Sequence, residues 1–108
     1  MAVRSISATL VFLLAGLAAC TAAVGQEGPR ERGKQLFTEH GCYGCHMIEK
    51  YGTPIATDLS HVGSKSSVAD LARWLRDPAA QKPTAHMPKI AMSESEAQAL
   101  AAYLGSLR

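Results

Sequence analysis

The sequence predicts a small all-α domain with three main helices. Apolar residues recur at helical spacing in three separate segments, and serine caps open two of these segments. No segment alternates polar and apolar residues in the way that a half-buried strand does. The chain has 108 residues, a length that allows one domain.

The first helix is expected from Pro29 to His40. Proline suits the first helical turn, where its missing N–H costs nothing. Leu36 and Phe37, with Gly33 one turn earlier, mark one face of this helix. Glycine lowers helix propensity, so Gly33 indicates either a close approach of another helix or a tolerated glycine.

The middle helix is expected to follow a loop over residues 49–66. Ser67 and Asp70 have the spacing of an N-terminal cap, and Pro78 ends the segment. Residues 79–92 contain further prolines and are again expected to be loop. The apolar stripe of this helix consists of Val68, Leu71, Ala72 and Leu75.

The last helix has the clearest signals. Ser93 and Glu96 form a capping box, in which each side chain bonds the other residue's backbone N–H. Gly105 is a natural stop. Between them lie Ala97, Leu100, Ala101 and Leu104 at helical spacing.

The N-terminal segment is expected to be a signal peptide over residues 1–19. A positive charge at Arg4 precedes an apolar run from Ile6 to Ala19, shorter than the roughly 20 residues that a spanning helix needs. The run leads into Leu17-Ala18-Ala19-Cys20, which resembles the lipobox of bacterial lipoproteins. An ordinary secretory cleavage, for instance after Ala23, is the alternative.

Cleavage before Cys20 defines the remaining organisation. Residues 20–28 are small and polar and are expected to form a lipid-anchored flexible tether, and residues 29–108 the folded domain. A tether of this length keeps the domain close to the membrane. The protein is then exported and sits on the periplasmic or extracytoplasmic face of a bacterial membrane. Eleven basic against nine acidic residues give no indication of nucleic-acid binding.

Residues 41–47 read GCYGCHM. Cys42 and Cys45 project to the same side of a helical turn, and His46 follows directly. This pattern is typical of c-type haem attachment, which needs two thiols for the vinyl groups and an iron ligand beside them. A thioredoxin-like site would need a β-α-β context, and structural zinc would need four ligands. Of the three cysteines, Cys20 is assigned to lipid and the other two to thioethers.

The sixth ligand of the iron has several candidates. Met47 adjoins the attachment histidine and cannot cross to the opposite face, and His40 lies on the attachment side. Met87 stands in a proline-bracketed loop long enough to pass round the ring edge. His86 competes as its neighbour, and Met92 can instead pack as core. His61 completes the set of donors.

Four motifs occur in the order found in class I cytochromes c, the family that this chain resembles. Gly33, Leu36 and Phe37 precede GCYGCH, and Leu71–Pro78 is similar to the family's middle helix. Met87-Pro88 resembles the loop that carries the axial methionine, and Ser93–Leu107 resembles the C-terminal helix. The resemblance covers about residues 29–107.

The resemblance implies the cytochrome c fold, with loops wrapped around one covalently bound haem c. Cys42 and Cys45 would form the thioethers, and His46 and Met87 would be the axial ligands. Trp74 N–H would bond the ligand sulfur or a propionate, with plain packing as the alternative. The resemblance also implies that Trp74 and Leu75 line the methionine side, that Leu59 lines the histidine side, and that Gly33 and Phe37 meet Tyr103.

The chain departs from the family pattern at three places. Thr57 stands where a proline carbonyl usually accepts from the ligand histidine, and any residue can supply that carbonyl. Ala85 replaces a threonine common two residues before the methionine, with Thr84 one earlier. Lys65 is the candidate where an arginine often approaches a propionate.

The resemblance implies electron transfer rather than enzymatic activity. The protein would shuttle single electrons between respiratory donor and acceptor proteins, expected to be membrane complexes in the class of oxidases or reductases, without a small-molecule substrate. Methionine ligation raises the potential relative to bis-histidine ligation. The alternatives are a fixed cytochrome c subunit of one membrane oxidase or reductase complex, and a ligand-binding or catalytic haem protein.

Overall fold

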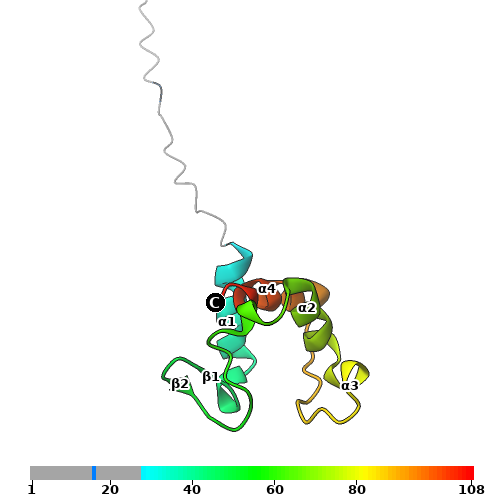
Figure 1. Ribbon diagram of the computed structural model, residues 1–108. Helices are drawn as coiled ribbons and strands as arrows, with labels where there is room; N and C mark the ends of the chain where they lie inside the picture. The colour runs from blue at the N-terminus through cyan, green and yellow to red at the C-terminus, as the bar shows by residue number, and fades with distance from the viewer. Residues whose placement is uncertain (1–15, 17–27) are drawn as a thin grey trace, which may run out of the picture.

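The computed structural model describes residue 16 and residues 28–108 (Figure 1). Its helices are α1 (Pro29–Glu39), α2 (Val68–Arg76), α3 (Pro78–Gln81) and α4 (Glu94–Gly105), with 3-10 turns η1 (Cys42–Gly44) and η2 (Val62–Ser64). Strands β1 (Met47–Ile48) and β2 (Tyr51–Gly52) form an antiparallel pair in which Ile48 lies opposite Tyr51. The predicted helical class is confirmed, and α1, α2 and α4 are its three main helices.

The expected signal peptide over residues 1–19 and the expected lipid-bearing Cys20 lie outside the described residues, as does the expected tether up to residue 27. Within residues 28–108, no helix has both the length and the apolar character that crossing a membrane requires.

Both predicted serine caps are confirmed. Ser67 Oγ accepts a hydrogen bond of 3.1 Å from the Asp70 N–H and so opens α2. At α4, Ser93 Oγ accepts from the Glu96 N–H at 3.2 Å, and Glu96 Oε1 accepts from the Ser93 N–H at 2.9 Å. These bonds satisfy N–H groups that have no partner within the helix.

Two expectations about the connecting segments are wrong. Residues 79–92 do not begin as loop, because Asp77 caps the short helix α3 and accepts from the Ala80 N–H at 3.2 Å. The sequence also shows no strand pattern, yet β1 and β2 pair. Each strand has only two residues, too few for an alternation of polar and apolar side chains to be recognised.

Helices α1 and α4 cross at Gly33. A Cβ built on Gly33 would lie 2.0 Å from the Ala99 carbonyl oxygen, so the predicted close approach of another helix is confirmed. Phe37 is buried one turn later and meets the rings of Tyr43 and Tyr103 edge-on, at centroid distances of 4.7 and 6.0 Å. The buried core consists of Leu36, Phe37, Ile48, Leu71, Ala72, Leu75, Ala99, Leu100, Ala101, Tyr103 and Leu104.

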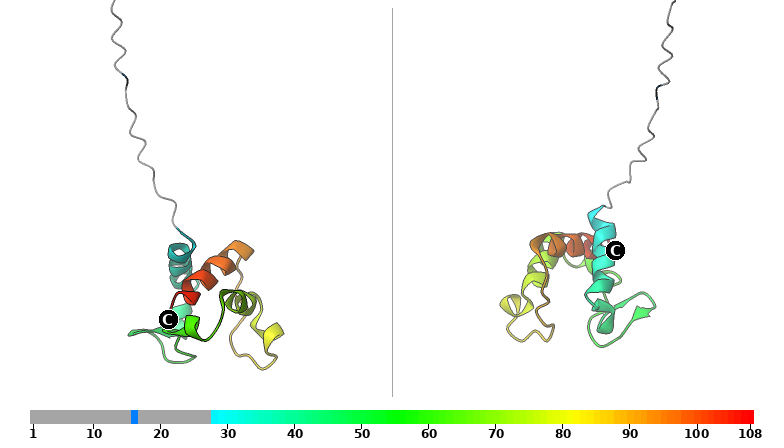
Figure 2. Two further views of the ribbon diagram at one scale, coloured as in Figure 1. Left: turned by 45° about the horizontal axis from the view of Figure 1, so that its top comes forward. Right: turned by 180° about the vertical axis from the view of Figure 1, so that it is seen from behind.

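Two groups of peripheral segments extend from this helical part. The η1 turn and the β1–β2 hairpin lie on one side, beyond the C-terminal end of α1 (Figure 1). Helix α3 and the loop 82–93 lie on the other side, beyond the C-terminal end of α2. The views in Figure 2 show the same separation. The fold therefore holds the attachment motif and the methionine-bearing loop on different arms of one helical support.

Candidate haem-attachment site

The attachment motif is built by a reversal of the chain after α1. Gly41 has a φ of 73°, a left-handed conformation that favours glycine. The N–H groups of Cys45 and His46 then both donate to the Cys42 carbonyl, at 3.2 and 3.0 Å, and close one turn. This turn holds the two cysteines at helical spacing, as the motif predicts.

The two thiols differ in their surroundings, and neither is in a disulfide. Cys42 is half-buried against the core, whereas Cys45 is exposed. Burial raises the pKa of the Cys42 thiol, against a smaller lowering effect from a backbone hydrogen bond. Cysteines of thioredoxin-like sites have a lowered pKa. The Cys42 thiol therefore lacks the lowered pKa of such sites, and both thiols are free at the spacing that thioether attachment needs.

His46 is oriented by the loop that follows it. Its Nδ1 lies 2.6 Å from the Thr57 carbonyl oxygen. A carbonyl can only accept, so Nδ1 carries the proton and donates, and Nε2 keeps its lone pair for a metal. The expectation that the Thr57 carbonyl orients His46 is confirmed, although threonine replaces the proline that is usual in the family at this position.

The same loop is fixed against the attachment turn by its backbone. The N–H groups of Ile55 and Ala56 both donate to the Cys45 carbonyl, at 3.2 and 2.7 Å. The Leu59 N–H donates to the Met47 carbonyl at 2.8 Å, and the Leu59 side chain packs against the core. The Thr57 carbonyl is thus placed by four neighbouring contacts rather than by a proline ring.

Met87 is held in place by a side chain of α2. The Trp74 indole Nε1–H donates to the Met87 sulfur at 3.2 Å, and both side chains are partly buried. Of the three readings of Trp74 that the sequence left open, the structure shows the bond to the methionine sulfur. The adjacent Leu75 is buried in the core. A methionine whose sulfur is fixed in this way is oriented before any metal binds.

One ion pair joins the end of α2 to the start of α4, on either side of the segment that carries Met87. Arg76 Nη2 at the end of α2 lies 2.5 Å from Glu94 Oε1 at the start of α4. Hydrogen bonds from Gln98 and then Arg76 hold the pKa of Glu94 below its usual value, so the carboxylate is charged at neutral pH. The ion pair therefore brackets residues 77–93, which comprise α3 and the loop that carries Met87, and so limits where Met87 can lie.

The other candidate ligands are placed less favourably. His86 and His61 are exposed. His40 is partly buried, and its Nε2 lies 3.6 Å from Glu96 Oε2. Met92 packs against the core, as its alternative reading expects. Met47 belongs to β1 and adjoins the attachment histidine.

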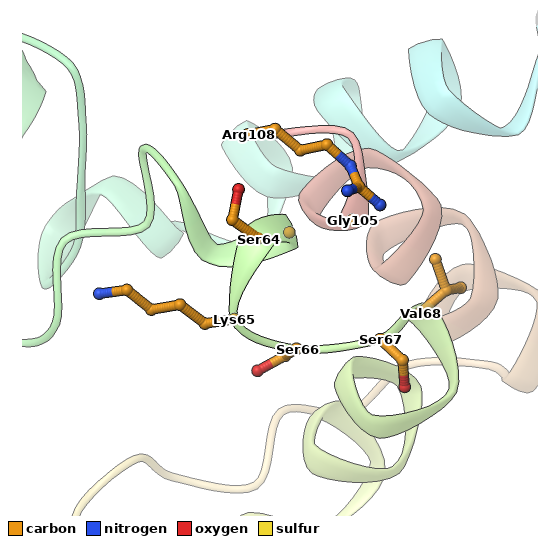
Figure 3. Close-up of a pocket in the computed structure, with 8 residues that line it drawn as sticks. Ser64, Lys65, Ser66, Ser67, Val68, Gly105 and Arg108 are labelled. Carbon is orange, nitrogen blue, oxygen red and sulfur yellow. The ribbon is translucent and has the colours of Figure 1, made fainter.

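Lys65, expected near a propionate, lies at the rim of a polar cavity of about 320 Å³ between η2 and α2. Gly105 and Arg108 line its other side. Figure 3 shows that the side chains of Lys65 and Arg108 extend in different directions from this cavity. The role of Lys65 toward a propionate stays a prediction.

Sequence reasoning missed how the hairpin is secured. Glu49 adopts a φ of 54°, which is rare outside glycine, and its N–H donates to Ser60 Oγ at 2.6 Å. A Cβ on Gly52 would lie 2.0 Å from the His46 carbonyl oxygen. Gly52 was the one visible signal, because glycine at a tight turn often marks a close backbone approach.

The Trp74 hydrogen bond leads to a first prediction. Trp74→Phe keeps an aromatic ring but removes the N–H. If Met87 ligates the haem iron, as the family resemblance implies, its sulfur would then be a better donor to ferric iron. We expect the midpoint potential to fall by about 20–60 mV, the value of one hydrogen bond of about 0.5–1.5 kcal/mol for a one-electron couple. Spectroscopic redox titration of the variant and the wild type measures this difference in midpoint potential.

The control for this variant is Tyr103→Phe. It also removes a polar group from an aromatic side chain, but at the crossing of α1 and α4. The potential of this control should stay at the wild-type value. Equal potentials in all three proteins would show that the bond from Trp74 has no influence on the iron.

Comparison with known proteins agrees with this geometry. Residues 30–108 match the family Cytochrome c. The chain is also 35% identical over 86 residues to cytochrome c oxidase subunit 2 of Alkalihalophilus pseudofirmus, a match that covers 71% of this chain and 25% of that relative. The chain thus corresponds to about a quarter of the relative's length. The family binds haem c covalently and transfers electrons. This chain belongs to the cytochrome c family.

Proposed function

We propose that this cytochrome is a one-electron carrier with a single haem c, attached through Cys42 and Cys45 and ligated by His46 and Met87. The observation that carries the proposal is the hydrogen bond from Trp74 to the Met87 sulfur. A sixth ligand that the fold holds in place leaves no open position for a substrate, and this arrangement suits electron transfer.

When bound, the haem supplies an iron centre that takes up and returns one electron. The protein residues prepare its surroundings. The Thr57 carbonyl keeps the His46 proton on Nδ1 and leaves Nε2 free to bind. The Trp74 N–H draws electron density from the Met87 sulfur and favours the reduced state. The buried side chain of Leu75 and the partly buried Leu59 would keep water from the iron, which limits solvent reorganisation when an electron is transferred.

We also propose that the carrier is exported and tethered to a bacterial membrane, on its periplasmic or extracytoplasmic side. The support is in the sequence: a signal peptide pattern over residues 1–19, a lipobox ending in Cys20, and a polar tether over residues 20–28. A respiratory donor and a terminal oxidase are the proposed partners. The oxidase is favoured because the relative that resembles this chain is an oxidase subunit.

Redox titration and intact-mass measurement of the membrane-extracted protein test the proposal together. The expected result is one haem per chain and a lipid-modified N-terminus that begins at Cys20. The redox titration should show a one-electron transition, and the spectrum should show the absorption band of iron bound to a methionine sulfur. A chain with two haems, or with a high-spin iron, would contradict it. A mature N-terminus after Ala23 would contradict the proposed lipid anchor at Cys20 but not the proposed electron-transfer role.

Carbon monoxide distinguishes this function from a ligand-binding or catalytic haem. With Met87 in place, the reduced protein should not bind carbon monoxide at neutral pH, because the sixth position is filled. Ready binding by the wild-type protein would show an open or labile site and would exclude the carrier role proposed here.

A second candidate function is that of a fixed subunit of one membrane oxidase or reductase. The observation that favours it is that the relative carries its matching region within an oxidase subunit. Extraction in mild detergent followed by size separation decides between the two. A free carrier would separate from large complexes, whereas a fixed subunit would stay with one of them in constant ratio.

A further inference from the structure

The segment that carries Met87 leaves the helical part at the end of α2 and returns to it at the start of α4. We call residues 77–93 the Met87 arm, which extends beyond the C-terminal end of α2 in Figure 1 and Figure 2. Within the described part of the chain, the bond from Trp74 to Met87 is the one hydrogen bond that joins residues 79–92 to a residue outside the arm.

Apolar packing anchors the arm near its two ends. Pro78, at the start of the arm, is buried, and Met92, near its end, packs against the core. The Met87 side chain also packs against the core, from the middle of the arm. The position of the methionine sulfur therefore depends on how firmly the base of the arm is held together.

One ion pair closes this base between its two ends. Arg76 is the last residue of α2 and Glu94 is the first residue of α4, and they are 18 positions apart in the chain. Arg76 Nη2 lies 2.5 Å from Glu94 Oε1, and the same oxygen accepts a hydrogen bond of 3.1 Å from Gln98 Nε2. The pair thus belongs to a small polar network rather than to two isolated side chains.

A second ion pair ties the methionine turn to the same base. Lys89 Nζ lies 3.9 Å from Asp77 Oδ2. The other carboxylate oxygen of Asp77 accepts from the Ala80 N–H at 3.2 Å and caps α3. Lys89 is two residues from Met87, and Asp77 directly follows Arg76. The two ion pairs therefore meet where the arm leaves α2.

Both pairs lie at the surface, where their side chains are between 42% and 68% exposed. An exposed ion pair shifts an equilibrium by about two- to fivefold, and dissolved salt weakens it. An effect of this size matters for the arm, because opening one segment takes much less free energy than unfolding the whole domain. Two such pairs favour a closed arm whose opening increases with ionic strength.

We propose that the Arg76–Glu94 and Asp77–Lys89 pairs act together as a clamp on the Met87 arm, and that opening of this clamp withdraws the Met87 sulfur from the place where it would bind iron. This inference rests on the proposed ligation by Met87. It adds which residues determine how firmly that ligand is held. It also names ionic strength as the condition that loosens it.

The test is the rate at which imidazole replaces the methionine sulfur in the ferric, haem-loaded, full-length protein. Loss of the absorption band of iron bound to a methionine sulfur measures this rate. Arg76→Gln should raise it about two- to fivefold, because the pair with Glu94 is lost. Arg73→Gln is the matched control and should leave it unchanged, because Arg73 pairs with Asp70 inside α2 and does not contact the arm.

The second pair is tested in the same way. Lys89→Gln should raise the imidazole rate, whereas Lys82→Gln should not, because Lys82 is an arm lysine without an ion pair among the described residues. The double variant with Arg76→Gln and Glu94→Gln should be no faster than either single variant, because all three lack the same pair.

Salt distinguishes a clamp made of charges from packing. Raising sodium chloride from about 10 mM to about 1 M should speed the replacement in the wild type by at least about twofold. The double variant with Arg76→Gln and Lys89→Gln should respond little to the same change, because both pairs are already absent. A wild-type rate that does not depend on salt would overturn the proposal.

A second readout needs no added ligand. Exchange of the Trp74 indole N–H with solvent, followed by NMR in the reduced protein, reports when its bond to Met87 opens. Exchange should accelerate in Arg76→Gln and Lys89→Gln by about the same factor as the imidazole rate. Equal exchange in these variants and their controls would reject the clamp. A wild type without the sulfur band would contradict the proposed function instead, and indole exchange would still decide whether the clamp exists.

Discussion

Met87→Ala is expected to lower the midpoint potential by on the order of 100 mV or more and to abolish the absorption band of the iron–sulfur bond. The structure supports so large an effect because the Met87 sulfur is held by the Trp74 N–H at 3.2 Å, within a segment bracketed by the Arg76–Glu94 ion pair. Unless His86 takes the vacated position, the reduced variant should also bind carbon monoxide, which the wild type should not. Redox titration and absorption spectra measure all three changes.

Neighbouring donors supply the controls for this experiment. His86 is exposed and adjoins Met87, so it can take the vacated position in the single variant and keep the iron low-spin. The double variant with Met87→Ala and His86→Ala removes this substitute and should be high-spin. Met92→Leu keeps core volume and should leave both spectrum and potential unchanged.

An intact sulfur band in Met87→Ala would show that Met87 is not the ligand. Loss of the band in Met92→Leu would transfer the role to Met92, and a low-spin spectrum without a sulfur band in the wild type would indicate His86. The three outcomes are distinct, because a sulfur ligand and a nitrogen ligand give different spectra and potentials.

The parts of the fold that sequence could predict are those encoded by local contacts. The caps at Ser67 and Ser93 each involve residues three apart, so their pattern is complete within one turn of chain. Gly33 was recognised because glycine inside a helix is unfavourable unless something lies against it. The predicted helices agree with the observed ones to within about a residue for the same reason.

The parts that sequence could not predict depend on contacts made after folding. Asp77 looks like the end of a helix because proline follows, and only the structure shows that it also opens α3. The positive φ of Glu49 is maintained by Ser60, eleven residues away, and nothing local to Glu49 indicates it. The family resemblance supplied the link between His46 and Thr57, which no local rule contains.

Gly33→Ala is expected to lower the free energy of unfolding by about 1–2 kcal/mol. The new Cβ would lie 2.0 Å from the Ala99 carbonyl oxygen and 2.7 Å from Tyr103 Cβ, and these atoms are backbone or directly attached to it. Neither can rotate away, so α1 and α4 must separate. Overpacking of this kind costs about 1–3 kcal/mol, occasionally more, and the roughly 1 kcal/mol gained in helix propensity offsets only part of it. Denaturant unfolding of the haem-loaded protein, followed by circular dichroism, measures the loss.

Gly28→Ala separates this clash from a general effect of replacing glycine. Gly28 immediately precedes α1, and a Cβ there would meet nothing within 4 Å. Gly28 is the N-cap of α1, where alanine is less favourable than glycine, so the stability of this variant should fall by less than about 1 kcal/mol. Because Gly33 is on the face of α1 that meets α4, and His46 and Met87 belong to arms carried by these helices and α2, Gly33→Ala should also shift the midpoint potential. If Gly33→Ala is as stable as Gly28→Ala, α1 and α4 are not as close as the structure places them. The proposal that their packing positions the attachment motif and the Met87 loop is then wrong.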